Sequence, residues 1–144
     1  MRTTRPGGTP VVAAPDEVLP IRTSEDVVRV RQAVRARAIA AGLGIVDQTK
    51  IVTAASELAR NTLDYGGGGT VLVSDVQEGA RRGVRLIFED QGPGIPDIAR
   101  ALTDGFTTGG GLGLGLSGSR RLSNEFAIES EVGVGTRIMI ARWK

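Results

Sequence analysis

The chain of 144 residues contains no cysteine and no histidine. Without cysteine it has no disulfide framework, no thiol nucleophile and no cysteine-based metal site. Without histidine a general base must come from Asp, Glu, Lys or Tyr, a histidine-based zinc site cannot form, and the chain cannot be phosphorylated on a histidine of its own. These two absences restrict the chemistry of the protein more than they restrict its fold.

Aromatic residues and long apolar runs are scarce as well. Three Phe, one Tyr and one Trp provide little material for stacking on bases, and the net charge is only +2. We therefore expect a mixed charged surface and no nucleic-acid partner. No apolar run approaches the roughly 20 residues that span a bilayer, and the first residues lack the apolar segment of a signal peptide. A cytoplasmic protein with no membrane partner is the simplest interpretation.

Length and local composition predict one domain preceded by a tail. A chain of 144 residues is large enough to bury a core without disulfides or metals. Residues 1–18 contain three prolines and two adjacent glycines and show no periodicity. We therefore expect a flexible tail there and the domain over residues 19–144.

Apolar periodicity and turn residues predict the elements of that domain. Ser24 and Asp47 are expected to cap two long helices, and Pro20 is expected to keep the first strand at a sheet edge. The order of the elements predicts a mixed, mostly antiparallel sheet with helices on one face, an α+β two-layer sandwich. The expected strands are 19–23, 71–76, 84–90, 127–131 and 136–142, and the expected helices are 24–41, 47–65, 97–103 and 114–125.

The first expected helix has an apolar stripe and arginine-rich polar faces. The stripe is formed at helical spacing by Val27, Val30, Val34, Ala38 and Ala41. The other faces carry Arg29, Arg31, Arg35 and Arg37. We interpret these arginines as solvated charges, with a surface that docks a partner as the alternative.

Glu57 and Asn61 form the first candidate site. They are four residues apart, so they share one face of a helix with side chains roughly 5–6 Å apart. An amide oxygen is a hard ligand suited to Mg²⁺, which keeps several waters and binds phosphates. A carboxylate can accept a proton from an attacking hydroxyl or water. An exposed Glu/Asn pair on an ordinary helix is the alternative.

Asp90 ends an apolar strand and shares a strand face with Leu86 and Phe88. If that face packs on the helices, the carboxylate is buried or half-buried and requires a donor, for which an adenine amino group is suitable. Gly92 and Gly94 then allow the backbone to approach a flat ligand closely. The alternative is an aspartate that starts a turn.

A glycine-rich run precedes the last expected helix. From Thr107 to Gly115 it presents many backbone N–H groups without Cβ atoms and leads into a helix N-terminus, where phosphate binding is favoured. A low-complexity linker is one alternative. Another is the dinucleotide-binding pattern G-x-G-x-x-G, which residues 113–118 match, but that pattern requires a preceding strand and a polar glycine loop stands there instead.

The three motifs occur in the order found in a known superfamily. The sequence resembles the N, G1 and G2 boxes and the closing element of the GHKL ATP-binding fold, shared by histidine kinases, gyrase B, Hsp90 and MutL, at ELARN (57–61), DQGPG (90–94), GGGLGLG (109–115) and GVGT (133–136). The resemblance covers about residues 20–144. Within the superfamily, the stretch DGFTTGGGLGLGLSGSRRLSNEF is similar to the stressosome switch serine/threonine kinases.

The resemblance implies roles for the residues at the base end of a nucleotide. Asp90 would bind the adenine amino group. Gly92 and Gly94 would lie beside the base, and Thr136 would contribute through a water.

It implies further roles at the phosphate end. Glu57 would be the general base and Asn61 a Mg²⁺ ligand. Which basic residue contacts the γ-phosphate stays open between Arg100, Arg120 and a residue of the partner. The ATP lid and phosphate cradle would comprise Thr107, Thr108, Gly109, Gly110, Gly111, Leu112, Gly113, Leu114 and Gly115.

The activity implied is that of a Mg·ATP-dependent kinase that phosphorylates Ser or Thr of STAS-domain scaffold or antagonist proteins. After release, the kinase would bind and activate a PPM-type phosphatase. One alternative is an anti-sigma factor kinase that sequesters a sigma subunit, against which the DGFTTGGGLGLGL segment counts. The other is a GHKL ATPase module that uses hydrolysis to drive conformational change, and we expect no transducer domain for it to drive.

Overall fold

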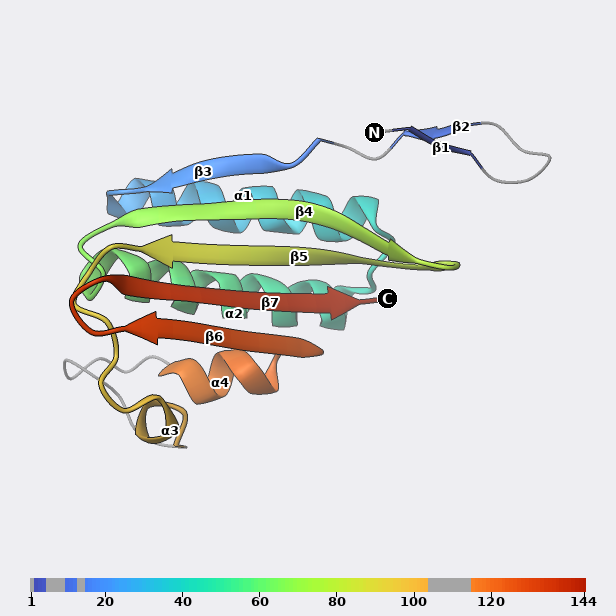
Figure 1. Ribbon diagram of the computed structural model, residues 1–144. Coiled ribbons are helices and arrows are strands. Elements are labelled where there is room, and N and C mark those ends of the chain that lie inside the picture. The colour runs from blue at the N-terminus through green and yellow to red at the C-terminus, as the bar shows by residue number, and fades with distance from the viewer. Residues whose placement is uncertain (1, 5–9, 13–14, 104–114) are drawn as a thin grey trace.

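The computed structural model describes residues 2–4, 10–12, 15–103 and 115–144 (Figure 1). Its main sheet has five strands in the order β3-β4-β5-β7-β6, and each neighbouring pair is antiparallel. The strands are β3 (Glu17–Ile21), β4 (Gly69–Glu78), β5 (Arg81–Asp90), β6 (Glu125–Glu131) and β7 (Gly135–Trp143). The expected order of elements is confirmed over this domain, and the sheet is antiparallel throughout rather than mixed.

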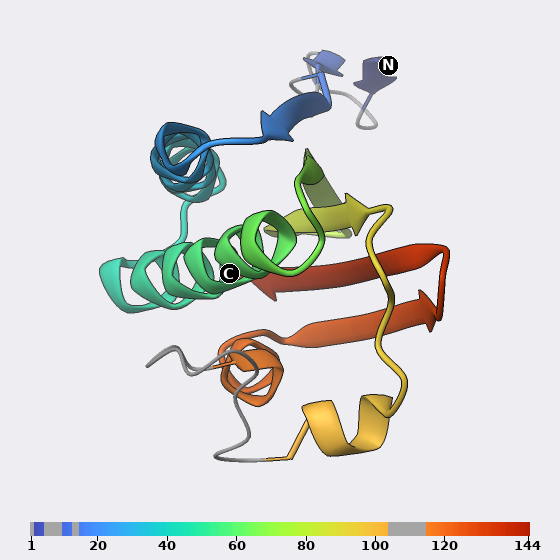
Figure 2. The ribbon, with the colours of Figure 1, turned by 90° about the vertical axis from the view of Figure 1, so that its left-hand side faces the viewer.

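The helices are α1 (Ser24–Ala40), α2 (Ile45–Asp64), α3 (Ile98–Ala101) and α4 (Gly115–Arg121). As Figures 1 and 2 show, α1 and α2 cover one face of the sheet, whereas α3 lies beyond its β6 edge, next to α4. This is the predicted α+β two-layer sandwich. Among the residues described, no helix is long and apolar enough to cross a membrane.

The core lies between the helices and the covered face of the sheet. The apolar stripe predicted for α1 is buried in full. Alternate residues of the central strands face it, as the period of two requires. Fully or almost fully buried side chains from α2 and the strands include Ile51, Leu58, Val71, Val73, Leu86, Phe88 and Ile140.

Helix α1 is capped by Thr23 and not by Ser24 as predicted. The Asp26 backbone N–H donates to Thr23 Oγ1, and Asp26 Oδ2 accepts from the backbone N–H groups of Arg22 and Thr23. This reciprocal capping box satisfies donors that the first turn leaves open. The Arg22 N–H bond is the main cause that lowers the pKa of the Asp26 carboxyl below its usual value, and the Thr23 and Arg29 bonds lower it further.

Helix α2 begins two residues before Asp47, so the predicted cap is also wrong. Gly44 occupies the cap position without a side-chain hydrogen bond. Asp47 lies in the first turn, and its Oδ1 accepts from Arg142 Nη2 of β7 at 2.7 Å. The Asp47 carboxylate therefore links the first turn of α2 to β7 and does not cap the helix.

Arg37 differs from the predicted solvated arginines of α1. Its side chain is only 13% exposed and lies 3.2 Å from Asp75 Oδ1 of β4. It also lies 3.7 Å from Glu17 and donates to the Pro15 carbonyl. Arg37 therefore fastens α1 to β3 and β4 at the end of the sheet opposite Asp90. Arg31 and Arg35 are exposed, as predicted.

Smaller differences concern the ends of elements. β1 (Arg2–Thr4) and β2 (Pro10–Val12) pair as a separate sheet within the stretch expected to be a tail. The hairpin of β4 and β5 is tighter than expected, with strand pairing up to Glu78 and Arg81. Helix α4 ends at Arg121, earlier than expected, because the chain turns at Asn124, whose N–H donates to the Ala141 carbonyl.

Candidate active site

A cavity of about 450 Å³ opens between α2, α3, the start of α4 and the ends of β5 and β7. This volume lies within the range of about 300–1,000 Å³ usual for small-molecule sites. The sequence-predicted residues that line it are Glu57, Asn61, Asp90, Gly94, Gly115 and Thr136. Residues from four separate stretches of the sequence thus meet at one cavity.

Two groups of predicted residues are placed differently. Gly92 is not among the lining residues, but its backbone N–H donates to Asp90 Oδ1 at 2.9 Å. Thr107, Thr108, Gly109, Gly110, Gly111, Leu112, Gly113 and Leu114 lie outside the described residues. Their predicted role as lid and phosphate cradle stays a prediction.

Asp90 is the last residue of β5 and is half-buried. It follows Leu86 and Phe88 on the covered face of the sheet, where both are at most 1% exposed. One carboxylate oxygen, Oδ1, is occupied by the Gly92 N–H. Within the described residues Oδ2 accepts no hydrogen bond, and Asp90 lies on the covered face of the sheet, as the strand parity predicted.

Gly66 lies against the Asp90 side chain. A Cβ at Gly66 would come within 2.5 Å of Asp90 Cβ and Cγ and within 2.6 Å of Oδ2. A Cβ at Gly92 would in turn lie 2.7 Å from Gly66 Cα. Glycine at both positions therefore lets two turns close around the carboxylate. None of the four sequence motifs includes Gly66, so the sequence alone does not predict this role.

Thr136 lies in a small hydroxyl network beside Asp90. It pairs with Asp90 across β5 and β7, and its Oγ1 is 2.8 Å from Ser130 Oγ. Ser130 Oγ also accepts from the Ile95 backbone N–H at 2.7 Å. The network joins β6 and β7 to the loop after β5, and Thr136 is almost buried. The hydrogen bonds of this network hold the loop that contains Gly94 against the sheet, next to the cavity.

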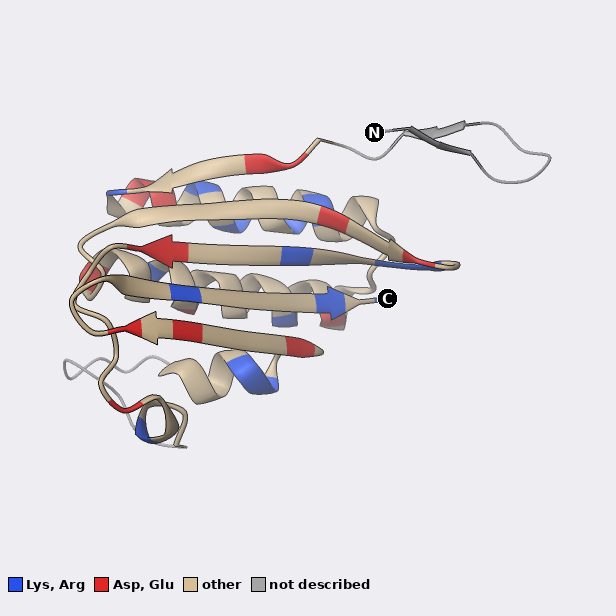
Figure 3. Ribbon diagram, in the orientation of Figure 1, with Lys and Arg blue, Asp and Glu red and all other residues tan. Residues whose placement is uncertain are grey.

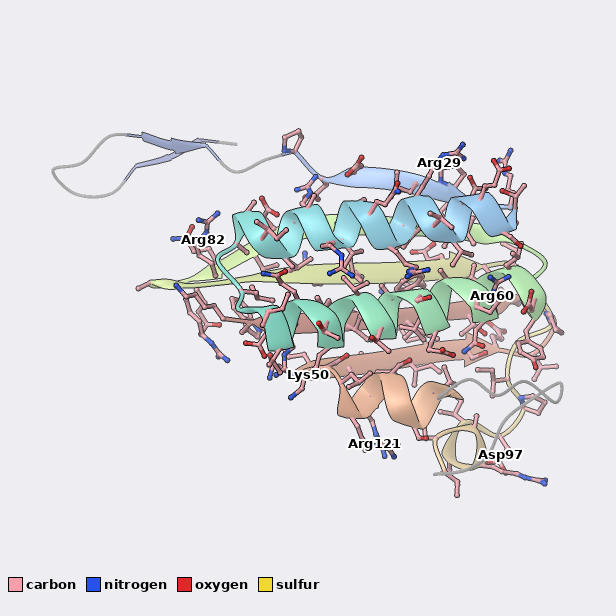
Figure 4. All side chains as sticks on the ribbon, turned by 180° about the vertical axis from the view of Figure 1, so that it is seen from behind. Arg29, Lys50, Arg60, Arg82, Asp97 and Arg121 are labelled. Carbon is pink, nitrogen blue, oxygen red and sulfur yellow. The ribbon has the colours of Figure 1, made fainter. Side chains whose placement is uncertain are left out.

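Glu57 and Asn61 lie on one face of α2, one helical turn apart. Both are half-buried and both line the cavity, so neither lies on a fully exposed helix face. Arg60 and Asp64 line it from the same helix. Figure 4 shows Arg60 on α2 beside the neighbouring end of α1.

The rest of the lining is largely apolar. Tyr65 is the C-cap residue of α2, next to Gly66, and it lines the cavity although 40% of its surface is exposed. Pro93 of the DQGPG motif also lines the cavity. The other apolar lining residues lie outside the four motifs and are Ile95, Ala101, Leu116 and Ile138. An apolar wall with one half-free carboxylate suits a heteroaromatic ring that carries an amino group. Only their proximity in space reveals these residues, because they belong to no shared motif.

The donors present fit a hydrated magnesium ion but not a metal held by protein alone. Within the described part of the chain, no group of three or more His, Cys, Asp or Glu residues is placed to hold an ion. Mg²⁺ usually keeps several waters and is completed by phosphate oxygens. Asn61, which lines the cavity one turn from Glu57, would supply an amide oxygen to such an ion.

Comparison with known proteins agrees with this geometry. A family model described as histidine kinase-, DNA gyrase B-, and HSP90-like ATPase matches residues 46–144. The chain is 48% identical over 123 residues to serine/threonine-protein kinase RsbT of Bacillus subtilis (strain 168), which covers 85% of this chain and 92% of that protein. It is 34% identical over 101 residues to the anti-sigma F factor of Geobacillus stearothermophilus, which covers 65% of this chain and 68% of that protein.

A solved structure shares the fold. The RsbU and RsbW domains of a Mycobacterium tuberculosis protein superpose with a TM-score of 0.63 at 20% identity, over 90% of this chain and 32% of that one. An identity this low supports the fold alone. The family model covers the cavity residues of α2, β5 and β7. This chain belongs to the family of histidine kinase-, DNA gyrase B- and HSP90-like ATPases.

Proposed function

We propose that this protein is an ATP-dependent serine/threonine protein kinase. The observation that carries the proposal is that Glu57, Asn61 and Asp90 line one cavity. A base, a metal ligand and an adenine acceptor are what transfer of a phosphoryl group from ATP requires. The similarity to RsbT, named a serine/threonine-protein kinase, supports the choice of acceptor.

In the proposed reaction, the hydroxyl oxygen of a Ser or Thr in a partner protein bonds to the γ-phosphorus of ATP. The bond between the γ-phosphorus and the oxygen that bridges it to the β-phosphorus breaks, and ADP leaves with the electron pair. The Glu57 carboxylate takes the hydroxyl proton. Because the chain has no histidine, no phosphohistidine of its own precedes the transfer.

The adenine ring would lie between Tyr65 and the loop of Gly94. Its amino group would donate to Asp90 Oδ2, the oxygen that the Gly92 N–H leaves open. Guanine carries a carbonyl at the corresponding position, which would oppose the carboxylate. We therefore expect ATP and ADP to bind better than GTP, with Thr136 assisting through a water.

The phosphates would extend from Asp90 along α2 toward Glu57. Asn61 would hold Mg²⁺ there, and the ion would neutralise phosphate charge during transfer. The segment 107–115 would close over the phosphates as a lid and offer them its backbone N–H groups. Gly115, the last residue of that segment, lines the cavity and has a φ of 67°, a conformation that favours glycine.

For partners, we propose STAS-domain scaffold or antagonist proteins as substrates and a PPM-type phosphatase as the target of the released kinase, all in the cytoplasm. The support is the likeness to RsbT together with the motif sequence of the lid. An anti-sigma factor kinase that sequesters a sigma subunit is the second candidate, since the anti-sigma F factor is also similar.

The test is label transfer. The protein is incubated with γ-labelled ATP, Mg²⁺ and either a STAS-domain protein or a sigma factor from the same genome. We expect label on a Ser or Thr of the STAS-domain protein, no label on the kinase, and loss of binding once that residue is phosphorylated. A control STAS-domain variant with alanine at the labelled position must stay unlabelled. Tight binding of a sigma factor with every STAS-domain protein unlabelled would favour the anti-sigma candidate instead.

A further inference from the structure

The cavity is richer in negative than in positive charge. Its acidic lining residues are Glu57, Asp64, Asp90 and Asp97, whereas the Lys and Arg residues that line it in the described part of the chain are Arg60 and Arg100. Figure 3 shows acidic residues at the ends of β5 and β6. A triphosphate would therefore obtain cationic contacts from the helices and not from the sheet.

Arg60 is placed by α2 between the predicted metal ligand and the predicted base. A helix rises about 1.5 Å per residue, so Arg60 lies about 1.5 Å along the axis from Asn61 and about 4.5 Å from Glu57. Gly66, which touches Asp90, lies just beyond the C-terminal end of α2. The order from the adenine end is thus metal ligand, arginine and base, with spacings fixed by one rigid helix.

The Arg60 guanidinium is only weakly held. Its Nη1 donates to Ser24 Oγ of α1 at 3.3 Å, and both residues are exposed. Within the described residues Arg60 forms no ion pair, although Asp64 stands one turn away on the same helix. Arg37 by contrast is half-buried and lies 3.2 Å from Asp75 Oδ1. A long hydrogen bond to a neutral hydroxyl costs little to break, so the side chain is free to turn toward an anion.

We propose that Arg60 is a catalytic residue that binds the γ-phosphoryl group and stabilises it during transfer, and that Ser24 holds it aside when the cavity is empty. The proposal rests on the proposed kinase function. Guanidinium presents paired N–H donors that match phosphate oxygens, and its charge would offset the charge that develops at the β–γ bridge. Arg100 lies on α3, so no common helix fixes its distance from the base.

The test compares nucleotides that differ by the γ-phosphate. ATP and ADP affinities of the full chain are measured by calorimetry with Mg²⁺ for the parent and Arg60→Gln. We expect Arg60→Gln to weaken ATP about tenfold or more, the scale of a charged hydrogen bond, and to leave ADP within about twofold. Turnover at saturating ATP should fall about 10²-fold or more, because an arginine that stabilises the transferring phosphoryl group contributes on this scale.

Two further variants separate catalysis from structure. Ser24→Ala removes the hydroxyl that holds Arg60 and should leave both affinities and turnover near those of the parent. Arg60→Lys keeps the charge but not the paired donors. Compared with Arg60→Gln, it should therefore regain part of the preference for ATP over ADP and little of the turnover.

Three results would overturn the proposal. One is an equal loss of ATP and ADP affinity in Arg60→Gln, and another is the same loss in Ser24→Ala, since each indicates a structural role. The third is an intact ATP preference with a raised KM for the protein substrate, which would make Arg60 a docking residue. Failure of the kinase function is a separate outcome: a parent protein that binds ATP but labels no partner still permits the comparison of ATP with ADP.

Discussion

Replacing Asp90 with asparagine tests the adenine contact most directly. The two carboxylate oxygens have different surroundings, because Oδ1 accepts the Gly92 N–H at 2.9 Å while Oδ2 lies against Gly66 and the cavity. Asparagine can keep its oxygen on the Gly92 side and thereby preserve the turn. Its NH₂ group would then face the adenine amino group, and two donors would oppose each other.

The expected loss follows from that geometry. A hydrogen bond to a charged acceptor is worth about 1.5–3 kcal/mol, which corresponds to a roughly 10- to 150-fold weaker affinity for ATP. ADP should lose the same factor, because the change lies at the base end. Unfolding temperature should change little, since the Gly92 contact survives and Asp90 is only half-buried.

The assay is calorimetric titration of ATP and ADP into parent, Asp90→Asn and a control. Asp97→Asn is a matched control, because Asp97 also lines the cavity and its Oδ1 accepts the Arg100 N–H, a bond that asparagine can keep. We expect the ATP and ADP affinities of Asp97→Asn to stay within about threefold of those of the parent, since this variant loses a charge but no direct contact with the nucleotide. Equal ATP affinity of Asp90→Asn and parent would remove Asp90 from the binding site.

Four further predictions use other parts of the structure. Glu57→Gln should keep ATP affinity while phosphoryl transfer falls about 10²-fold or more, measured by single-turnover labelling; an unchanged rate would reject the base assignment. Asn61→Ala should lose the Mg²⁺ dependence of ATP affinity, and persistence of that dependence in titrations with and without the ion would contradict its role. Gly66→Ala should weaken ATP binding and lower stability by about 1–3 kcal/mol, because its Cβ would clash with the Asp90 side chain; Gly44, with nothing within 4 Å of a Cβ, provides the control substitution. Asp26→Asn should flatten the acid limb of the stability curve: the folded-state pKa of Asp26 is lowered, so its contribution is present above the usual value near 3.8 and is lost as pH falls below it.

The positions of the site residues could be predicted because each motif is local. Glu57 and Asn61 are separated by one helical turn, and the strand parity of Asp90 is set by Leu86 and Phe88. Period and spacing determine which face such residues occupy, and the structure places those faces at one cavity.

Contacts between distant residues could not be predicted in this way. Asp47 and Arg142 are 95 residues apart, and Arg37 meets Asp75 through the packing of α1 on β4. No periodicity links such pairs. The sequence therefore predicts a helix cap at Asp47 and a solvated side chain at Arg37, and both predictions are wrong. The cap of α1 was missed for another reason: Thr23 and Ser24 are both good cap residues, and the reciprocal bonds of Asp26 decide between them.

The two ends of the cavity are built in different ways, and this bears on how a kinase of this kind would work. At the base end, Asp90 is held before a nucleotide arrives, since β5 pairs with β4 and β7 there and the Gly92 N–H fixes one carboxylate oxygen. Little side-chain freedom would remain to be lost on binding, so the proposed contact would favour recognition of adenine in ATP and ADP alike.

At the phosphate end, Arg60 has only a long bond to an exposed hydroxyl. Immobilising the Arg60 side chain when a nucleotide binds would cost roughly 0.5–1.5 kcal/mol of binding free energy. A contact between the guanidinium and a γ-phosphoryl group would offset this cost. ADP offers no group there, so the arginine would stay with Ser24. A rigid acceptor for the base and a movable cation for the γ-phosphate would together let the protein hold either nucleotide while only ATP completes the catalytic arrangement.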